Sequence, residues 1–557
     1  MSPPTESVAV TDYTDPAAPT DTDAFRAAVD AVADAGGGTV TVPAGEYETG
    51  TVRLRDHVTL RLAAGATVYA ARDPAEYTDD RPGPEGEPPF LLADDCADVA
   101  VVGRGCIDGR SADFLDMDDP IRGHSAESDA HPLVSNGPHR ARQGDDYLDR
   151  SAGTDEWPVA KGAFRPGPML LFDGCENVLV ADVTLRDMPA WTVALDDCDG
   201  AAVRGVTVDN HMRVPNCDGV SVMNSEDVRI ADCRIYSCDD SVTVGARAGV
   251  DRPTRGVVVT NCVLSSSACA VKVGSETAGD VSDLLVSNCV VRSSNRGLGV
   301  QHRDEGSVEN VRFSDITVET RLRPGPWWGK AEPVYVTSVP RDEGTDLGSV
   351  SGVHFSDVVA DADNGGVVYA HETADVRDVR LDGVRLRVGS SPHADAVGGN
   401  FDLQPTSVVP PVWERDIPAL HCENVSDLAV RDLTVEWGDA PEPYYAEGLR
   451  CVGVDGVVVD GFEGRGAHAR ASGDDTGGDP DPAVALRATT GATVRNGRAR
   501  PGTGAFLAVS DTDDDRLFAN NDLAEAAVGI EGEHGFTTRG NLPPRGSNPS
   551  GDAGERE

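Results

Sequence analysis

The stretch VRIADCRIYSCDDSVTVGARAGVDRPTRGVVVTNC, residues 228–262, contains two copies of one six-residue pattern. VRIADC at 228–233 and VVVTNC at 257–262 have apolar residues at their first and third positions and Asp or Asn directly before a cysteine. Related phrases run along the chain, and the residues at their polar position are Asp182, Gly205, Asp232, Asn261, Asn288 and Asp315. These positions are 23, 27, 29, 27 and 27 residues apart, so the sequence repeats about every 25 residues.

A repeat of this length indicates the fold class. Each copy holds two or three short β-type runs and no helical pattern, and it is too short for a βαβ unit. Stacked coils, with strands about 4.7–4.9 Å apart, are the remaining solution. We therefore predict an all-β fold, a single-stranded parallel β-solenoid from about Gly37 to Arg498, with the repeated Asp and Asn side chains at its turns.

Segments outside the repeat give the domain organisation. The run TDTDAFRAAVDAVADAGGG predicts an amphipathic helix from about Asp23 to Ala35, placed within an N-terminal segment 1–36 to cap the open end of the solenoid. Residues 113–163 are expected to form an irregular insertion in the solenoid. After it we expect a C-terminal coil or cap over 499–545 and a disordered tail over 546–557.

The charge of the chain excludes some partners. Its 557 residues include 94 Asp and Glu against 48 Lys and Arg, a net charge of -46, and the lysines are Lys161, Lys272 and Lys330. Such a polyanion repels nucleic acid and anionic membrane surfaces. An acidic, lysine-poor surface is typical of a halophilic protein, soluble in concentrated salt, where the screening length falls to about 3 Å at 1 M.

Targeting signals and cysteine spacing bear on the compartment. The start MSPPTESVAVTDYTD has neither the basic nor the apolar region of a signal peptide, and no apolar run approaches the roughly 20 residues of a membrane span, so we expect a cytoplasmic protein. The 12 cysteines follow the repeat instead of a CxxC spacing. Reduced, buried cysteines are therefore expected, without disulfides or a zinc site. The sequence leaves the oligomeric state open.

Stacking the coils in register makes residues at equivalent positions neighbours. Aligning the strands by alternation gives an inward-facing row of Val193, Val220, Val242, Val271 and Leu298. Two residues earlier stand Trp191, Asp218, Asp240, Cys269 and Arg296. One residue later, on the outward face, stand Ala194, Ser221, Thr243, Lys272 and Gly299.

This register predicts three clustered acids. Asp218 and Asp240 stand on successive coils, about 5 Å apart along the stack, with Asp239 beside them. Carboxylates this close raise at least one pKa, which a turn-capping role would not require. Glycoside hydrolysis needs such a set, because one protonated acid serves the leaving oxygen and ionised bases serve water. A calcium site is the alternative explanation.

Several motifs follow one another in an informative order. The N-terminal helix and glycine run is followed by GRGCIDG at 103–109, PAWTVAL at 189–195, PNCDG at 215–219 and SCDDS at 237–241, with a step of 21 from Asp218 to Asp239. In this order, over roughly residues 20–320, the sequence resembles glycoside hydrolase family 28, the polygalacturonase family of right-handed parallel β-helices. The resemblance implies a right-handed helix.

The resemblance also implies roles for residues. It makes Asp239 the general acid of an inverting hydrolysis and Asp218 and Asp240 the pair that activates water. Asn216 would orient this group or the sugar. The resemblance implies neither a metal nor an organic cofactor, and it implies an oligo- or polysaccharide substrate.

The sequence departs from the family pattern at two positions. The family's Gly-His-Gly is ACA at 268–270, and its Arg-Ile-Lys is GVQ at 299–301. Since those cations bind a uronate carboxylate in the family, galacturonate does not follow as the substrate. Lys272 lies one coil away from Gly299 on the outward face, so we expect that the cation facing the substrate has moved to Lys272. Pairing of Lys272 with Glu276 is the structural alternative.

Further residues complete the predicted substrate site. Around the acids we expect substrate-binding side chains of cationic, acidic and aromatic type: His211, Glu276, Arg296, His302, Arg303, Trp327, Trp328 and Lys330. The two tryptophans stand in a Pro/Gly loop, where they either stack on a sugar or anchor the loop.

Three functions fit this set of residues. The first is an inverting glycosidase acting on pectic or related plant oligosaccharides, with large insertions favouring action at chain ends. The second is a calcium-dependent lyase or epimerase that uses the three acids as metal ligands and Lys272 or Arg296 as the base. The third is a non-catalytic carbohydrate-binding solenoid, which leaves the packed acids unexplained.

Overall fold

The protein is described here by a computed structural model. The structure describes residues 6–78, 87–120, 157–161, 164–323, 327–393, 399–403, 406, 408–410, 412–469, 480–512, 516–533 and 535–545. All structural statements below refer to these residues. The predicted disordered tail, 546–557, lies outside them.

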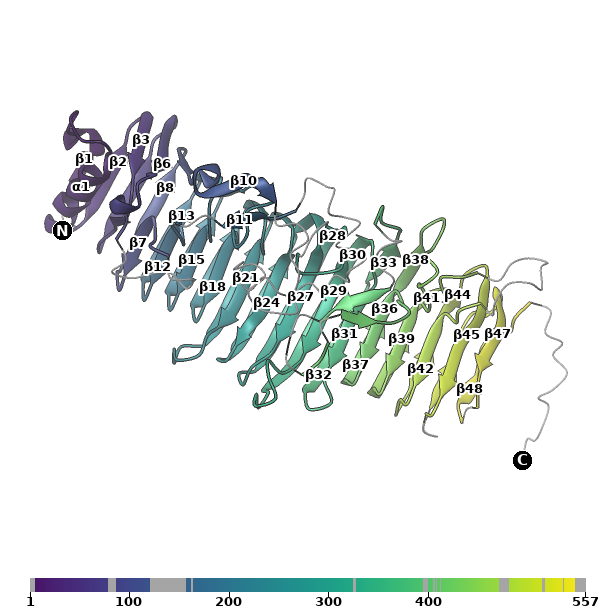
Figure 1. The fold of residues 1–557 in the computed structure, drawn as a ribbon. Helices are drawn as coiled ribbons and strands as arrows, with labels where there is room; N and C mark the ends of the chain where they lie inside the picture. Colours follow the sequence, from purple (N-terminus) through teal and green to yellow (C-terminus); the bar gives the residue numbers. More distant parts are fainter. Residues whose placement is uncertain are drawn as a thin grey trace.

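Each coil of the molecule contributes three short parallel strands. One coil holds β18 (Val220–Met223), β19 (Glu226–Ala231) and β20 (Arg234–Ser237), and the next holds β21 (Val242–Ala246), β22 (Thr254–Thr260) and β23 (Val263–Ser266). Strands at equivalent places pair, β18 with β21, β19 with β22 and β20 with β23. Figure 1 shows the resulting elongated stack, a right-handed parallel β-helix.

The first strand of each coil joins one long sheet, which carries the candidate site. In the described part of the chain this sheet has 15 strands. Their bounds are β4 Val52–Arg53, β7 Leu91–Asp94, β12 Leu170–Asp173, β15 Val193–Asp196, β18, β21, β24 Cys269–Thr277, β27 Arg296–His302, β29 Glu332–Ser338, β31 Gly366–Ala370, β36 Leu420–Glu423, β39 Leu449–Val452, β42 Val484–Arg487, β45 Thr503–Ser510 and β47 Ala526–Glu531.

The repeated polar residues explain the turn between the second and third strands. Asp182, Asp232, Asn261, Asn288 and Asp315 all have positive φ, from 52 to 63°. Asp and Asn tolerate this left-handed conformation better than other residues with a side chain. Asn261 Nδ2 also donates to Asp232 Oδ1 on the preceding coil at 3.1 Å. The repeat is therefore structural at these acids, as predicted.

The core lies inside the coils and has the predicted register. Val193 pairs with Val220, Val220 with Val242, Val242 with Val271, and Val271 with Leu298. All five side chains are fully buried. Most cysteines are buried as well, and all 12 are free thiols, in agreement with their predicted role as spacers.

The N-terminal end of the β-helix agrees with the prediction better than the C-terminal end. Helix α1 (Thr22–Asp34) begins and ends one residue before the predicted bounds and lies at the N-terminal end of the stack (Figure 1). At the other end the β-helix continues past its predicted bound at Arg498, into the segment 499–545 that was expected to form a coil or cap. Strands continue through β45, β46 (Leu517–Ala519), β47 and β48 (Thr537–Arg539), paired in the same two sheets.

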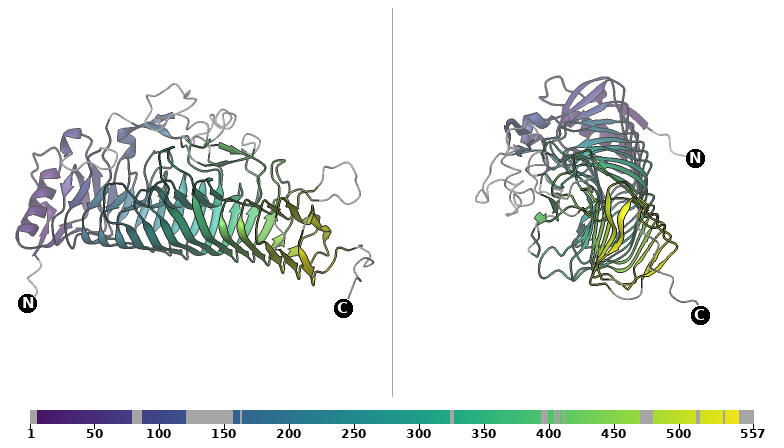
Figure 2. Two further views of the ribbon diagram at one scale, coloured as in Figure 1. Left: turned by 90° about the horizontal axis from the view of Figure 1, so that it is seen from below. Right: turned by 90° about the vertical axis from the view of Figure 1, so that its right-hand side faces the viewer.

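Two antiparallel hairpins interrupt the regular coils. In the predicted insertion, α2 (Ser111–Phe114) leads to β10 (Leu115–Pro120), which pairs with β11 (Val159–Lys161). This pair projects from one side of the stack (Figure 2). The second hairpin, β34 (Asn400–Asp402) with β35 (Val412–Glu414), was not predicted. None of the helices in the described ranges has the length and hydrophobicity needed to cross a bilayer.

Candidate active site

The three predicted acids lie on two turns that lead into neighbouring strands. Asp218 precedes β18, and Asp239 and Asp240 lie between β20 and β21. The backbone N–H of Gly219 donates to the carbonyl of Asp240 at 2.9 Å, which joins the two turns. One carboxylate oxygen of each acid lies within 4.8 Å of those of the other two. The structure thus brings together Asp218, Asp239 and Asp240, which we call the acid cluster.

Hydrogen bonds hold the acid cluster in place. Asp240 Oδ1 accepts from the backbone N–H of Cys269 at 3.1 Å, and the backbone N–H of Asp240 donates to Asp239 Oδ1 at 3.0 Å. The hydroxyl of Thr243 lies 3.4 Å from Asp218 Oδ2 and 3.4 Å from Asp240 Oδ2. Asp218 and Asp240 are buried, whereas Asp239 is partly exposed. Asp239 is therefore the member that a substrate reaches most easily.

Lys272 provides a positive charge within the acid cluster. It lies on β24, next to Thr243 of β21 and Gly299 of β27 in the ladder, as the register predicted. Its Nζ forms an ion pair with Asp240 Oδ2, and its side chain is only 14% exposed. Burial by itself lowers the pKa of Lys272, but Asp240 and Asp239 outweigh this effect and the pKa is raised. Lys272 therefore stays charged at neutral pH.

The protonation of Asp218 follows from its surroundings. Burial, and then the charges of Asp239 and Asp240, raise the pKa of Asp218 well above its usual range, while Lys272 acts in the opposite direction. Since Asp239 and Asp240 act on Asp218 as like charges, the three acids share protons as one set. The acid cluster can therefore hold a proton and a base at the same pH, as general acid and base catalysis requires.

A cation site is the alternative role for the acid cluster. Three carboxylates at this spacing could supply oxygen ligands to Ca²⁺. The ammonium group of Lys272, however, already lies against Asp240. A fixed positive charge at this distance opposes a divalent cation in the same space. The donor set fits acid and base chemistry better than a calcium site.

A family model places this site among known proteins. The model "Glycosyl hydrolases family 28" matches residues 135–397, which include the whole acid cluster. In this part the chain is similar to glycoside hydrolase family 28.

Curated relatives and solved structures agree with this assignment. An exo-poly-alpha-D-galacturonosidase of Dickeya chrysanthemi is 26% identical over 285 residues, 47% of this chain and 46% of the relative. A probable polygalacturonase of Vitis vinifera is 24% identical over 268 residues, 45% of this chain and 46% of the relative. The chain thus spans about half the length of the curated relatives that it matches.

Two solved structures show the fold. The family 28 exopolygalacturonase of Yersinia enterocolitica has a TM-score of 0.58 at 20% identity, covering 82% of this chain and 79% of its own. The exopolygalacturonase of Thermotoga maritima has a TM-score of 0.55 at 22% identity, covering 70% of this chain and 88% of its own. At these identities the likeness establishes the parallel β-helix shared with family 28 proteins.

Two predicted residues of the family 28 site precede Asp218. Asn216 has a φ of 55°, and no donor among the described residues reaches its buried Oδ1. This oxygen is therefore available to a ligand near the acid cluster. His211 accepts a hydrogen bond from the backbone N–H of Arg213 at its Nδ1, and burial, followed by the charge of Arg213, lowers its pKa.

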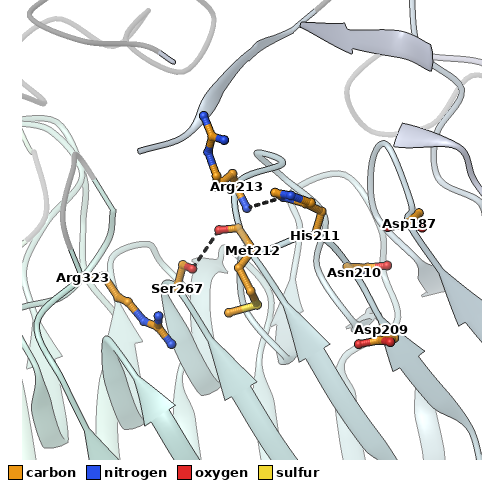
Figure 3. A pocket seen from close by; sticks show the side chains of 8 residues that line it. All are labelled: Asp187, Asp209, Asn210, His211, Met212, Arg213, Ser267 and Arg323. Atoms are coloured by element: carbon orange, nitrogen blue, oxygen red, sulfur yellow. Dashed lines mark hydrogen bonds between the residues drawn. The ribbon is translucent and has the colours of Figure 1, made fainter. Parts of the chain in front are cut away.

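His211 belongs to a pocket beside the acid cluster. The pocket has a volume of about 410 Å³ and is lined by Asp187, Asp209, Asn210, His211, Met212, Arg213, Ser267 and Arg323. Figure 3 shows His211 and Arg213 on one side and Arg323 and Ser267 on the other, with the Ser267 hydroxyl bonded to the Met212 carbonyl. Ser267 also donates its backbone N–H to Cys238, the residue before Asp239. The pocket and the acid cluster therefore share one row of turns.

Arg296 and Lys330 are corrected from substrate contacts to structural residues. Arg296 Nε lies 3.3 Å from Glu332 Oε2, and its Nη2 donates to the Asp402 carbonyl at 3.0 Å. Its guanidinium also stacks on the ring of Tyr335, 3.6 Å from the centroid. Lys330 is fully buried, and this burial lowers its pKa to about 7. We call Arg296, Lys330, Glu332 and Asp402 the Arg296 cluster; it ties the β34–β35 hairpin to the stack.

The other predicted substrate contacts also differ in how far they are exposed. His302 is fully buried and bonded at both ring nitrogens, to Ser338 Oγ at 2.8 Å and the Gly306 carbonyl at 2.7 Å, so its prediction as a sugar contact is wrong. Trp327 is buried and fits the loop-anchoring alternative, whereas Trp328 is partly exposed. Arg303 is also buried, and this burial lowers its pKa to about 10.

Two features of the site were not predicted as functional. Thr243, which bridges Asp218 and Asp240, stood in the predicted outward row beside Lys272, so its contact could have been inferred from the register. Asp402 had no such signal, because it lies 106 residues after Arg296 in an inserted hairpin. Glu276, the expected structural partner of Lys272, raises the pKa of that lysine, but Asp240 holds its ammonium group.

Proposed function

We propose that this protein is a glycosidase that hydrolyses O-glycosidic bonds of pectic or related plant oligosaccharides. The observation that carries the proposal is the acid cluster, three carboxyl groups within 4.8 Å on adjacent coils of a family 28 segment. Like charges this close destabilise a fold, and acid and base catalysis gives them a use. The names of the curated relatives support a pectic substrate.

The acids divide the two proton transfers between them. Asp239, the partly exposed member, donates a proton to the leaving glycosidic oxygen as the bond from the sugar breaks. Asp240, which pairs with Lys272 and accepts from the Cys269 N–H, takes a proton from the attacking water. Asp218 orients that water together with Asp240, to which it is linked through the Thr243 hydroxyl. Asn216 Oδ1 accepts from a sugar hydroxyl.

The stereochemical outcome is proposed from the family resemblance. Inverting enzymes with two carboxyl groups usually hold them roughly 6.5–9.5 Å apart. The acid cluster is tighter, because two of its three members act on the same water. Its spacing therefore does not give the outcome, and the proposal of inversion needs the product anomer. Action at chain ends is supported by the hairpins inserted between the coils.

The test is a digest of pectic and other plant oligosaccharides, in high salt, followed by ¹H NMR. We expect new reducing ends that first appear as the anomer opposite to the substrate's, with unchanged rates in EDTA. A product with a carbon–carbon double bond, formed only without chelator, would assign the acids to a metal-dependent lyase. Binding without any cleavage would instead support a carbohydrate-binding solenoid.

A further inference from the structure

The positive charge of Lys272 is already paired with acidic side chains of the protein. Its Nζ lies against Asp240 Oδ2, and Asp239, Glu276 and Asp218 add their negative fields to it. Only 14% of its side chain is exposed. An ammonium group in this position serves as the counter-ion of Asp240. It offers little to a carboxylate on a bound sugar, which would have to compete with Asp240 for it.

The charge around Lys272 stays negative. Even if Asp239 holds the proton that it donates and Asp218 also keeps one, Asp240 and Glu276 carry two negative charges against the one positive charge of Lys272, which leaves one negative charge. A sugar carboxylate would add another negative charge within a few ångströms of these groups, in a partly buried site where Coulomb repulsion is strong. The protein as a whole, with a net charge of -46, repels anions in the same direction.

The next cation along the column is not available either. Arg296 is 1% exposed, and Glu332, Asp402 and the ring of Tyr335 surround its guanidinium. The arginines of the neighbouring pocket, Arg213 and Arg323, share that pocket with two acids, Asp187 and Asp209.

An uncharged side chain, Gln301, occupies a position from which a cation could bind a sugar carboxylate. Gln301 lies on β27, two residues after Gly299 and therefore on the same outward face as Lys272. It is 1% exposed, and neither Oε1 nor Nε2 has a hydrogen-bond partner among the described residues. Its ladder neighbour on β24 is Gly274, which has no side chain. An amide needs both a donor and an acceptor, and sugar hydroxyls provide both, whereas a carboxylate only accepts.

We infer that the sugar bound over Lys272, Gly299 and Gln301 is neutral, with hydroxyl groups and no carboxylate turned toward these residues. The inference rests on the proposed function and narrows its substrate class. The cleaved residue is then a neutral sugar of a plant glycan, such as a hexose or pentose unit, even where other residues of the same glycan are uronates. This departs from the galacturonate named for the curated relatives.

The experiment compares an acidic oligosaccharide with its carboxyl-reduced form. Reduction of each C6 carboxyl group to a hydroxymethyl group keeps the ring configuration and the linkages and removes only the charge. With pectic oligosaccharides treated in this way, we expect kcat/KM to be at least about tenfold higher for the neutral form, since removing one repulsion between like charges in a partly buried site is worth at least about that factor. A higher kcat/KM for the native uronate would overturn the inference while leaving the glycosidase proposal intact. Cleavage of neither form, nor of any neutral plant oligosaccharide, would count against both.

A variant at Gln301 provides a second readout. Gln301→Lys places a cation on the outward face, and it should lower KM for the uronate form and raise KM for the neutral form. Gln301→Met is the matched control, because it keeps the length of the side chain without charge or hydrogen bonds, and it should raise KM for the neutral form alone. If Gln301→Lys folds, as judged by circular dichroism, and leaves the ratio of the two KM values unchanged, the assignment of this face to the sugar is wrong.

Discussion

The acid cluster and the Arg296 cluster lie along the same column of the 15-stranded sheet, but their charges are balanced differently. In the Arg296 cluster, two cations, Arg296 and Lys330, accompany two acids, Glu332 and Asp402, and the paired side chains are at most 2% exposed. In the acid cluster Lys272 alone accompanies three acids, and Asp239 remains partly open.

This difference in charge balance distinguishes a structural cluster from a catalytic one. A balanced and enclosed set of charges satisfies itself, so it stabilises one arrangement of the chain, here the position of the β34–β35 hairpin. In the acid cluster, burial and an excess of carboxyl groups raise the pKa of Asp218, so the cluster retains a proton at a pH where a lone carboxyl group would lose it. The two clusters should therefore respond in opposite ways to substitution.

The largest expected effect is on turnover, at the acid cluster. Asp239→Asn and Asp240→Asn should each lower kcat by at least about two orders of magnitude, the usual range for a lost general acid or base. Asp239 is partly exposed, so Asp239→Asn should also keep the thermal midpoint of the wild type. Initial rates and circular dichroism melts test this. Asp232→Asn is the matched control, since Asp232 has a φ of 58° at a turn where the next coil carries Asn261, and its activity should equal that of the wild type. A loss of rate in the control would show that the assay reports turn stability.

The next effect is on stability, at the Arg296 cluster. Arg296→Met leaves Glu332 and Asp402 buried without their guanidinium partner, so we expect a loss of roughly 3–5 kcal/mol in the free energy of unfolding. Urea titration measures it. Arg55→Met removes an exposed pair with Asp30 and should cost about 1 kcal/mol or less. Equal shifts in the two variants would contradict the buried role of Arg296.

A smaller effect is on the pH profile, at Lys272. Lys272 lowers the pKa of Asp218, so its removal in Lys272→Met raises that pKa further. The limb of the pH–rate profile that reports Asp218 should then move to higher pH, and kcat should fall by about tenfold. Lys272→Arg keeps the charge and should restore most of the profile. A profile that is the same in Lys272→Met and wild type would remove Lys272 from the catalytic set.

The smallest effect is a gain of stability at Asp218. Burial and neighbouring charges raise its folded pKa above the unfolded value, so between these values the folded chain keeps a proton that the unfolded chain releases. The contribution of this group to stability is complete below the unfolded pKa and is lost as pH rises through the folded pKa. Asp218→Asn should therefore be more stable than wild type at neutral pH, with no gain near pH 3. Equal unfolding midpoints at pH 7 would contradict the buried, strained state of Asp218.

The repeat made much of this arrangement predictable. In stacked parallel strands one correct pairing sets all others, so the row from Val193 to Leu298 and the neighbours of Lys272 followed from alternation alone. The convergence of Asp218 with Asp240 followed from the same register.

The features that were not predicted depend on contacts outside the repeat. Asp402 reaches Arg296 from an inserted hairpin, whose place on the stack has no periodic signal. The ion pair of Lys272 depends on the direction of a flexible side chain, which register does not specify. At the C-terminal end the repeat is present in a shorter form. Asn520 has a φ of 58°, like Asp232, but it follows a strand of only three residues.

The most direct test of the account is the turnover per folded molecule of Asp240→Asn relative to Arg296→Met, on one oligosaccharide that the wild type cleaves. The account predicts that Arg296→Met, once corrected for its unfolded fraction, retains turnover close to that of the wild type, while Asp240→Asn falls at least about a hundredfold below it. Equal turnover of the two variants would contradict the assignment of catalysis to the acid cluster and of structure to the Arg296 cluster.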